Sequence, residues 1–422
     1  MNDPLNQVLL QPSVRVGADL EQWLAQGGGK ALQQAIDKPA SIIPVIKQAG
    51  LSGLGGSGFP THIKWQAVAA QKNLIETDKY LICNGNEDEP GTFKDRVLLK
   101  ETPHQLIEGA LVAAMACGLN NIVFYINPVL HEALHNMQKA LRQWLESPLF
   151  TAANRQLDRP LIMQVKASSG HYIGGEETAA IESVEGHFPF PRGRPPFPFE
   201  AGVYGCPTLV NNIETLCNVP HIISLGPTRY KQLGVGLASG TKLYSLSGDV
   251  LNPGLYELPM GTPLRELVFN YGGGILQGKK FKAVFTGGPS NTLLTSEDLD
   301  VHLDFDSVSK LHASLGTGAM IVVSEGTDML KKVAEYIGFF AHSSCGQCPS
   351  CKTGTYYISM LLNRIDTGQG RPADLDQLIN LCNILPGSGK CALIDGAVKV
   401  LESSLFHFKD EYTRALKPRI IS

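Results

Sequence analysis

The sequence lacks the features that mark several classes of protein. Its net charge is only −3 in 422 residues, whereas a nucleic-acid-binding surface usually carries a strong basic excess. The most apolar span, 106–126, is interrupted by Glu108, Gly118 and two asparagines, which predicts a helix followed by a strand and not a membrane crossing. Residues 1–16 show no basic start followed by an apolar stretch, so we expect no secretion signal. We therefore expect no nucleic-acid partner and no direct membrane span.

Cysteine is also scarce. The nine cysteines, an odd number, occur singly except for one cluster at 345–351. Disulfide frameworks need paired cysteines and an oxidising compartment, whereas scattered thiols are typical of a reducing one. We expect a cytoplasmic protein in which the clustered thiols serve as ligands.

The chain is long enough for several domains, and its periodicity changes three times. Residues 1–50 are expected to form a helix and loop extension without a chemical signature. An α/β domain is predicted for 51–238 and a small α+β module for 239–326, which starts with a hairpin around "NPG". Four helical stretches with short links predict a helical bundle for 327–422.

The α/β prediction depends on an alternation of short and long patterns. Apolar runs rich in β-formers occur at 79–84, 121–126 and 161–167, and helical spacing occurs between them at 104–117 and 129–146. Strand, helix, strand, helix, strand is typical of a mostly parallel sheet with crossover helices.

A glycine-rich loop, "GLGGSGFPTHIKW", precedes a predicted helix. Glycines let a backbone approach phosphate closely, and a helix N-terminus offers N–H groups to an anion. Lys64 adds a charge, and Phe59 is placed to pack on a flat ring. The spacing is not the Rossmann fingerprint, so a nucleotide site and a flexible turn both remain open. The glycines are Gly53, Gly55, Gly56 and Gly58.

Polar side chains gather where the first predicted strand ends. "CNGNEDEPGTFKD" places five of them close together: Asn84, Asn86, Glu87, Asp88 and Glu89. The carboxyl edge of a parallel sheet is where ligands bind, although a solvated acidic loop gives the same pattern. "GHYIGGEETAAIESVEG" (170–186) repeats glycines before an acidic helix start, where helix capping is the simpler alternative. Three such loops favour a large, polyhydroxylated ligand.

The cysteine cluster has the form C-x2-C-x2-C. Cys345, Cys348 and Cys351 are three close thiols, and Cys391, in a glycine-flanked loop, is the best fourth ligand; Cys382, inside a helical pattern, is weaker. Structural zinc sites more often use two separated pairs, so the spacing favours a [4Fe–4S] cluster over zinc.

With these residues in view, the chain resembles the flavin-bearing, NADH-oxidising subunit of respiratory complex I and its relatives in NAD-dependent formate dehydrogenases and hydrogenases. The resemblance covers about residues 45 to 415 and includes "DEPGTFKDR", "RPPFPFEAG", "PTLVNNIETL", "NPGLYELPMGT", "SCGQC" and "HFKDEY". It implies an α/β fold: a Rossmann-like FMN domain with a parallel sheet, a ubiquitin-like β-grasp (SLBB-like) module, and a C-terminal helical bundle with an iron–sulfur cluster.

The resemblance also implies site residues. FMN is expected to contact the glycine loop together with Lys64, Asn84, Glu87, Gly175, Glu176, Asn211 and Asn212, and Asn86 and Tyr172 are further expected cofactor-binding residues. NADH is expected on the flavin, with Phe59 and Phe197 on its adenine side and Glu89 and Glu177 near its ribose hydroxyls; Arg194 stands where the family usually has Lys.

The cluster ligands that the resemblance implies are Cys345, Cys348, Cys351 and Cys391. Lys352 replaces the usual Arg after the third cysteine, and we expect changed hydrogen bonding to the cluster sulfurs.

Several residues depart from the family pattern. Leu54 replaces an Arg, His62 a Gly, Asn86 an Asp, Gly174 a Cys, and Ala67 an aromatic. The N-terminal loops are partly similar to the C subunit of the Rnf ferredoxin:NAD oxidoreductase. These changes bear on dinucleotide binding more than on FMN binding.

The resemblance implies a hydride transfer from NADH to FMN and then single electrons to the cluster, or the reverse, NAD reduction. No protein residue is required as acid or base, although Glu87 and Glu89 are nearby. The expected partners are a thioredoxin-like [2Fe–2S] subunit and further iron–sulfur subunits, which would hold the chain at the periphery of the cytoplasmic membrane. Two alternatives stay open: an electron-relay subunit with weakened dinucleotide oxidation, and a structural zinc protein.

Overall fold

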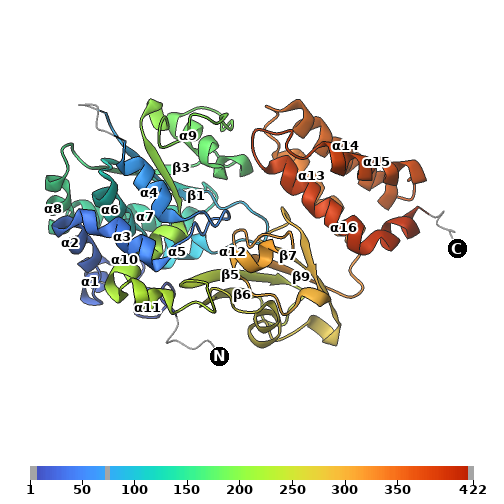
Figure 1. The fold of residues 1–422 in the computed structure, drawn as a ribbon, viewed down its shortest axis with the longest axis horizontal. Coiled ribbons are helices and arrows are strands. Elements are labelled where there is room, and N and C mark those ends of the chain that lie inside the picture. The colour runs from blue at the N-terminus through green and yellow to red at the C-terminus, as the bar shows by residue number, and fades with distance from the viewer. Residues whose placement is uncertain (1–6, 72–76, 417–422) are drawn as a thin grey trace.

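The fold consists of a parallel-sheet domain, a second sheet beside it, and a separate group of C-terminal helices (Figure 1). The structure is a computed structural model that describes residues 7–71 and 77–416. Among these residues no helix is long and apolar enough to cross a membrane.

The first sheet has four parallel strands in the order β3-β2-β1-β4. They are β1 (Tyr80–Gly85), β2 (Asn121–Ile126), β3 (Ile162–Ala167) and β4 (Thr208–Asn212). The first three match the predicted runs. β4 is not indicated by periodicity, because it is short and ends in two asparagines, which are depleted in strands. The strand order reverses between β1 and β4, the position where ligands bind in open α/β sheets.

Helices cover both faces of this sheet. On one face, α6 (Pro103–Cys117) and α10 (Ile213–Leu225) pack together and are almost wholly buried. The other face is covered by α9 (Glu177–Glu185), whose Ile181 and Val184 join a small core with β-strand residues. The remaining helices of this domain are α1 (Leu20–Ala25), α2 (Lys30–Asp37), α3 (Ile42–Ala49), α4 (Thr61–Ala69), α5 (Asp95–Glu101), α7 (His131–Leu145), α8 (Pro148–Gln156) and α11 (Pro227–Lys231).

Two buried carboxylates tie the N-terminal residues to the rest of the fold. Glu108 of α6 accepts hydrogen bonds from the Trp23 indole and from backbone N–H groups at the start of α2. Glu257 accepts backbone N–H bonds from residues 8, 9 and 10 and a hydroxyl bond from Thr241. The N-terminal extension is thus part of the core.

The second sheet has the order β6-β5-β9-β7-β8. Its strands are β5 (Thr241–Gly248), β6 (Gly254–Pro259), β7 (Phe281–Thr286), β8 (Leu293–Thr295) and β9 (Ala319–Ser324), with the short helices η5 (Glu266–Tyr271) and α12 (Phe305–Ser309). β5 and β6 form the predicted antiparallel hairpin around "NPG", and β9 runs parallel to β5. A mixed sheet with a short helix is the β-grasp arrangement that the sequence led us to expect.

The C-terminal residues form four helices that pack on one another, as predicted. They are α13 (Met329–Ser343), α14 (Pro349–Asp366), α15 (Pro372–Ile384) and α16 (Leu393–Ala415). The C-x2-C-x2-C cluster spans the α13–α14 junction: Cys348 is the N-cap of α14, and Cys351 lies in its first turn. Cys391 lies just before α16.

Candidate functional site

A cavity of about 480 Å³ lies where the three parts of the fold meet, and we call it the junction cavity. The three loops singled out in the sequence all reach it: the glycine loop, the end of β1 and the loop before α9. Seven of the predicted cofactor-binding residues line it: Gly55, Gly56, Asn86, Glu89, Tyr172, Gly175 and Glu176. The parallel strands bring these loops together because their carboxyl ends share one edge of the sheet.

The junction cavity also has walls that the sequence argument missed. The β-grasp module contributes two glycine-containing turns, 287–291 and 314–317, and α16 contributes Asp395 and Lys399. The signal was present as "TGGPSN" and "LGTGA", since paired glycines outside a hairpin often mark a close approach of backbone. Only tertiary packing shows that the approach is to this cavity.

Glu89 is the carboxylate most enclosed in the junction cavity. Its Oε2 accepts a 2.6 Å hydrogen bond from the Tyr172 hydroxyl, whereas its Oε1 has no hydrogen-bond partner of standard geometry among the described residues. Burial raises the pKa of Glu89 to about 7, and Tyr172 and Ser290 offset this only in part. Near neutral pH the group is therefore divided between its ionised form, in which Oε1 accepts a hydrogen bond, and its protonated form, in which Oε1 can donate one.

Asn86 joins two of the loops. Its amide donates to Asp88 Oδ2 at 3.0 Å and to the His171 carbonyl at 3.1 Å, and its carbonyl accepts from Ser168. An aspartate at this position has no N–H to donate. The departure from the family pattern thus provides a hydrogen bond that closes the loop before α9 onto the end of β1.

A second cavity, of about 540 Å³, lies on the other side of Ser57 and holds five more of the predicted residues; we call it the aromatic cavity. Its lining includes Phe59, Lys64, Glu177, Arg194 and Phe197, and also Ala67. The two phenylalanines are among the more exposed large apolar side chains of the protein, at 43% each. Exposed rings at a cavity suit the flat face of an aromatic ligand.

Ion pairs run between the two cavities. Lys64 Nζ lies 2.8 Å from Glu177 Oε1, and Arg194 bridges Glu176 and Glu177 at 2.9 and 3.2 Å. Glu176 also caps α9 through the N–H groups of residues 178 and 179, as the capping alternative predicted. Lys64 is thus neutralised by a carboxylate here, so it meets a phosphate only where that pair opens.

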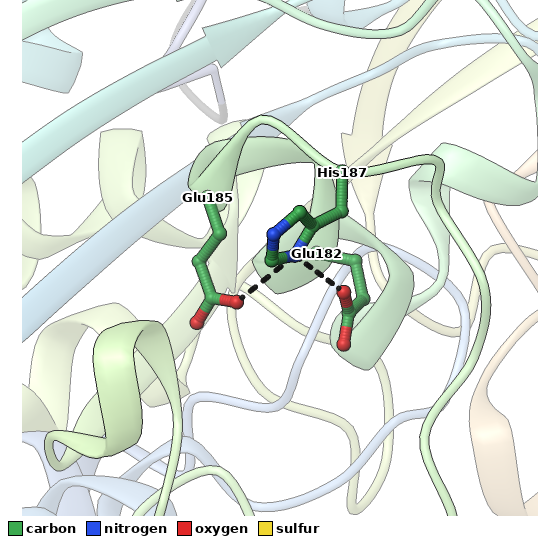
Figure 2. A group of neighbouring side chains, drawn as sticks. All are labelled: Glu182, Glu185 and His187. Carbon is green, nitrogen blue, oxygen red and sulfur yellow. Dashed lines mark hydrogen bonds and ion pairs between the residues drawn. The ribbon is translucent and has the colours of Figure 1, made fainter.

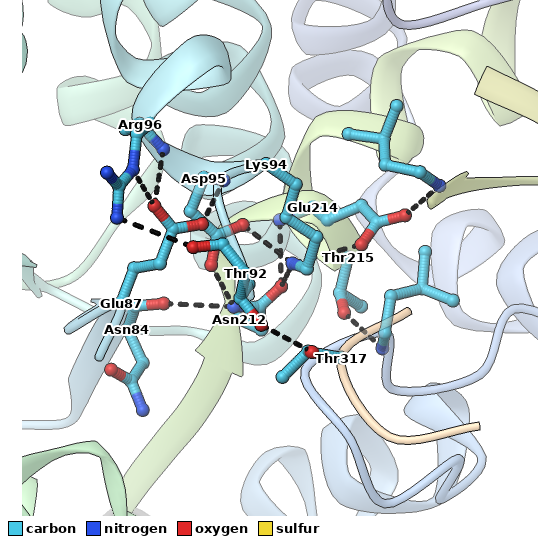
Figure 3. A network of polar contacts seen from close by, with 12 residues as sticks. Asn84, Glu87, Thr92, Lys94, Asp95, Arg96, Asn212, Glu214, Thr215 and Thr317 are labelled. Atoms are coloured by element: carbon cyan, nitrogen blue, oxygen red, sulfur yellow. Dashed lines mark hydrogen bonds and ion pairs between the residues drawn. The ribbon is translucent and has the colours of Figure 1, made fainter. Parts of the chain in front are cut away.

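Four of the predicted residues lie behind the cavities, where their side chains are already hydrogen bonded. Asn84 donates to the Gly175 carbonyl, Asn211 accepts from the Trp65 indole, and Glu87 pairs with Arg96 at 2.6 Å. Asn212 caps α10 and bonds Lys94, Asp95 and the Asn84 carbonyl. We infer that in this structure these side chains hold the loops in place (Figure 3).

At the centre of this network lie the buried charges Lys94, Asp95 and Glu214 (Figure 3), and the buried Lys242 balances them. Glu214 Oε2 is 2.6 Å from Lys242 Nζ and 3.0 Å from Lys94 Nζ, and Lys94 is 2.7 Å from Asp95. Lys242 also donates to the carbonyls of Leu54 and Thr317. One ammonium therefore ties the glycine loop to the β-grasp wall of the junction cavity.

Glycines let the glycine loop lie close to its neighbours. A Cβ on Gly55 would lie 2.7 Å from Asn212 Cβ, and one on Gly58, which has φ +64°, would lie 2.6 Å from the Phe305 ring. Gly53 forms a backbone pair with Phe59. The loop is thus a fixed cradle and not a flexible turn.

The four predicted cysteine ligands surround one small cavity together with Ser344, Gly389 and Lys390. Sulfurs bound to one tetrahedral zinc lie about 3.8 Å apart, given a Zn–S bond of about 2.3 Å. Among the described residues, however, no three cysteine sulfurs lie within 4.8 Å of one another. As they stand, these sulfurs are thus not gathered around a single ion, which agrees with the larger cluster that the C-x2-C-x2-C spacing favours. Cys382 is buried in α15, away from this cavity.

Two polar groups of the protein lie within hydrogen-bonding distance of the cysteine sulfurs. The Lys390 N–H donates to Cys348 Sγ, and the Ser344 hydroxyl lies 3.3 Å from Cys351 Sγ. Lys352 bonds instead to the carbonyls of Ala341 and Ser344, at the end of α13. The ammonium of residue 352 therefore binds the C-terminus of α13 in this structure, and the changed hydrogen bonding to the cluster sulfurs stays a prediction.

Cys391 lines both the cysteine cavity and the junction cavity, as do Ile173 and Leu393. The cysteine cavity and the junction cavity are therefore neighbours, separated by a wall that contains these three residues.

Comparison with known proteins agrees with this geometry. Residues 46–221 match the family model described as the Nuo51 FMN-binding domain, 243–292 the SLBB domain, and 331–415 the NADH-ubiquinone oxidoreductase-F iron-sulfur binding region. An F subunit of the NADH-quinone oxidoreductase of Rhizobium meliloti (strain 1021) is 42% identical over 404 residues, 95% of each chain. This chain belongs to the family of NADH-quinone oxidoreductase F subunits. The F subunit of Escherichia coli (strain K12) is 38% identical over 94% of this chain and 90% of its own.

The chain also has a solved structural relative. The crystal structure of an NAD+-reducing [NiFe]-hydrogenase in the H2-reduced state superposes with a TM-score of 0.84 at 33% identity, covering 96% of this chain and 68% of that chain. As a member of this family, the chain is an NADH oxidoreductase subunit with an FMN domain and a [4Fe–4S] region, and it is part of a multi-subunit complex.

The residues present fit both groups that an F subunit holds. The junction cavity offers glycine backbone, amides and the unpartnered Glu89 Oε1 to a polyhydroxylated flavin nucleotide. The cysteine cavity offers four thiols at wider spacing than zinc requires.

The surrounding structure accommodates two of the residues that depart from the pattern of the F subunits. Leu54 is buried at 1% exposure, and Thr215 and Lys242 bond its backbone. At Gly174 a Cβ would lie 2.8 Å from Ser169 Oγ and 2.9 Å from the Tyr125 hydroxyl, so these hydroxyls occupy the space of a cysteine side chain.

One further cluster of metal-ligand type is an ion-paired surface. Glu182, Glu185 and His187 lie together at the end of α9 (Figure 2). Both carboxylates are bound by Arg192, at 2.6 and 2.8 Å. A guanidinium already holds the charge that a metal would need, so this cluster stabilises the loop after α9.

Proposed function

We propose that this chain oxidises NADH at the junction and aromatic cavities and passes the electrons through the cysteine site to partner iron–sulfur proteins. The observation that carries this proposal is the position of Cys391, which lines both the junction cavity and the cysteine cavity. A shared wall gives electrons a short path from a flavin site to a cluster site. The same geometry serves the reverse direction, NAD reduction.

The roles of the site residues follow from their positions. The glycine loop and the loops after β1 and before α9 hold FMN, and Phe59 and Phe197 receive the adenine of the dinucleotide. FMN, when bound, accepts a hydride and releases electrons singly. Glu177 lies where it accepts a hydrogen bond from a ribose hydroxyl, and Cys345, Cys348, Cys351 and Cys391 hold the cluster. No acid–base pair is needed.

The partner and the location form the finer part of the proposal. Four cysteine ligands hold one cluster, so further redox centres must belong to other subunits. We place a small thioredoxin-like [2Fe–2S] subunit beside the helical region and the assembly in the cytoplasm, peripheral to the membrane. The relatives from Rhizobium meliloti and Escherichia coli are named for NADH-quinone oxidoreductase.

A visible spectrum of anaerobically purified protein, before and after NADH, tests the function. We expect the flavin absorption to bleach and the cluster absorption to decrease when NADH is added. A protein replete with flavin that NADH leaves unbleached would contradict dinucleotide oxidation and would favour the electron-relay alternative. Colourless protein that holds zinc and no iron would contradict both.

The aromatic cavity gives the relay alternative its support, because Ala67, which lines it, adds no ring to those of Phe59, Phe197 and Phe199. We expect Ala67→Phe to lower the KM for NADH about two- to tenfold, since an aromatic contact contributes about 0.5–1.5 kcal/mol. NADH:ferricyanide kinetics measure this. Gln66→Phe, exposed on the same helix α4, is the control and leaves KM unchanged. Equal KM values for both variants would show that the ligand does not reach Ala67.

A further inference from the structure

The turn 287–291 of the β-grasp module packs directly against the side chain of Glu89. A Cβ atom on Gly288 would lie 2.3 Å from Glu89 Oε1 and 2.5 Å from its Cγ. No side chain fits there unless Glu89 moves. Gly288 thus sets how far this carboxylate extends across the junction cavity.

The opposite side of the carboxylate is held by Tyr172. Its hydroxyl donates to Glu89 Oε2 at 2.6 Å, and its ring packs edge-on against Phe339 and Phe340 of α13, with centroids 5.0 and 6.1 Å away. Glu89 is therefore clamped between the β-grasp turn and a tyrosine that the helical region supports.

The turn itself has no room to retreat. A Cβ on Gly287 would lie 2.6 Å from Gly316 Cα, in the other glycine turn of the same module. A Cβ on Gly396 of α16 would lie 3.0 Å from Ser290 Cβ, so α16, the helix that follows Cys391, packs closely against the turn. A side chain added at Gly288 must therefore displace Glu89 and not the turn.

We propose that the turn 287–291 positions Glu89, through Gly288, so that Oε1 accepts a hydrogen bond from an N–H or O–H group of the ligand in the junction cavity. This rests on the proposed function, which makes that ligand FMN or the dinucleotide. Oε1 is enclosed and has no hydrogen-bond partner of standard geometry among the described residues, and a ligand donor satisfies it. Gly288 and Ser290 are positioning residues, and the β-grasp module takes part in ligand binding by holding Glu89 in place.

Gly288→Ala tests this against a matched control, Gly326→Ala. Gly326 has φ +94°, close to the +95° of Gly288, but its Cβ would meet nothing within 4 Å. The backbone strain of the two variants is therefore alike, and only the contact with Glu89 differs. Three quantities are measured on the full chain: the KM and kcat for NADH with ferricyanide, and the FMN dissociation constant of flavin-free protein by fluorescence.

We expect Gly288→Ala to weaken one ligand about tenfold or more, with kcat within about twofold, because a hydrogen bond to a charged group contributes about 1.5–3 kcal/mol. A raised KM identifies the dinucleotide as the donor, and a raised FMN dissociation constant identifies the flavin. In a Glu89→Gln background the Gly288→Ala effect disappears. Should Gly288→Ala not fold, Ser290→Ala makes the same test, with an effect of about threefold or more that Glu89→Gln abolishes.

Identical behaviour of Gly288→Ala and Gly326→Ala would overturn the inference, as would a Gly288→Ala effect that persists in full with Glu89→Gln. A wild-type protein that NADH fails to bleach would contradict the proposed function instead, and the FMN measurement, which needs no turnover, would still decide the role of the turn.

Discussion

A Cys391→Ser variant is expected to lose its iron–sulfur cluster and to keep its flavin. Cys391 is one of four thiols around the cysteine cavity, and a cubane needs a ligand for each iron. We expect the iron content to fall from about four atoms per chain to near zero, with loss of the broad cluster absorption. NADH is still expected to bleach the flavin, because none of the residues assigned to hydride transfer is changed.

The matched control is Cys382→Ser. Cys382 lies in the same helical region but is buried in α15, outside the cysteine cavity. We expect this variant to keep its full iron content. Iron retained in Cys391→Ser and lost in Cys382→Ser would contradict the ligand assignment, and zinc in place of iron in both variants would contradict the cluster. Iron analysis and the visible spectrum measure both outcomes.

A Glu214→Gln variant is expected to have a free energy of unfolding about 3–5 kcal/mol lower than that of the wild type, because an uncompensated buried charge has about this cost. Glu214 is fully buried and lies within 3.0 Å of two ammonium groups, Lys94 and Lys242. The substitution keeps the size of the side chain but leaves two buried cations with one carboxylate, Asp95. Guanidinium denaturation monitored by circular dichroism measures the change. The control is Glu297→Gln, an exposed residue of the same charge, which we expect to change stability by less than about 0.5 kcal/mol.

A double variant separates charge balance from packing. Adding Lys242→Met to Glu214→Gln leaves one buried cation, Lys94, paired with one buried anion, Asp95, so the charges balance again. We therefore expect the double variant to be less destabilised than the sum of the two single variants by more than about 1 kcal/mol. Additive losses would mean that each side chain acts through its own packing and not through the shared network.

The sequence by itself determined the order of the parts and the chemistry of the loops. Alternating apolar runs located β1, β2 and β3, and the cysteine spacing located the candidate metal ligands, because these patterns are local: each depends on residues a few positions apart. Polar residues after a buried strand indicated a ligand edge for the same reason. The motifs also placed the chain in its family, which comparison with known proteins confirmed.

Only the tertiary structure decided which side chains face the ligand. Glu87 and Asn212 lie in the same motifs as predicted cavity residues, but Arg96 holds the Glu87 side chain and Lys94 the Asn212 side chain behind the cavity. The strand β4, the turn 287–291 and the clamp on Glu89 follow from contacts between residues far apart in the sequence, such as Tyr80 with Thr208 and Glu89 with Gly288. Such contacts depend on how whole layers pack, and neither periodicity nor spacing in the chain encodes them locally.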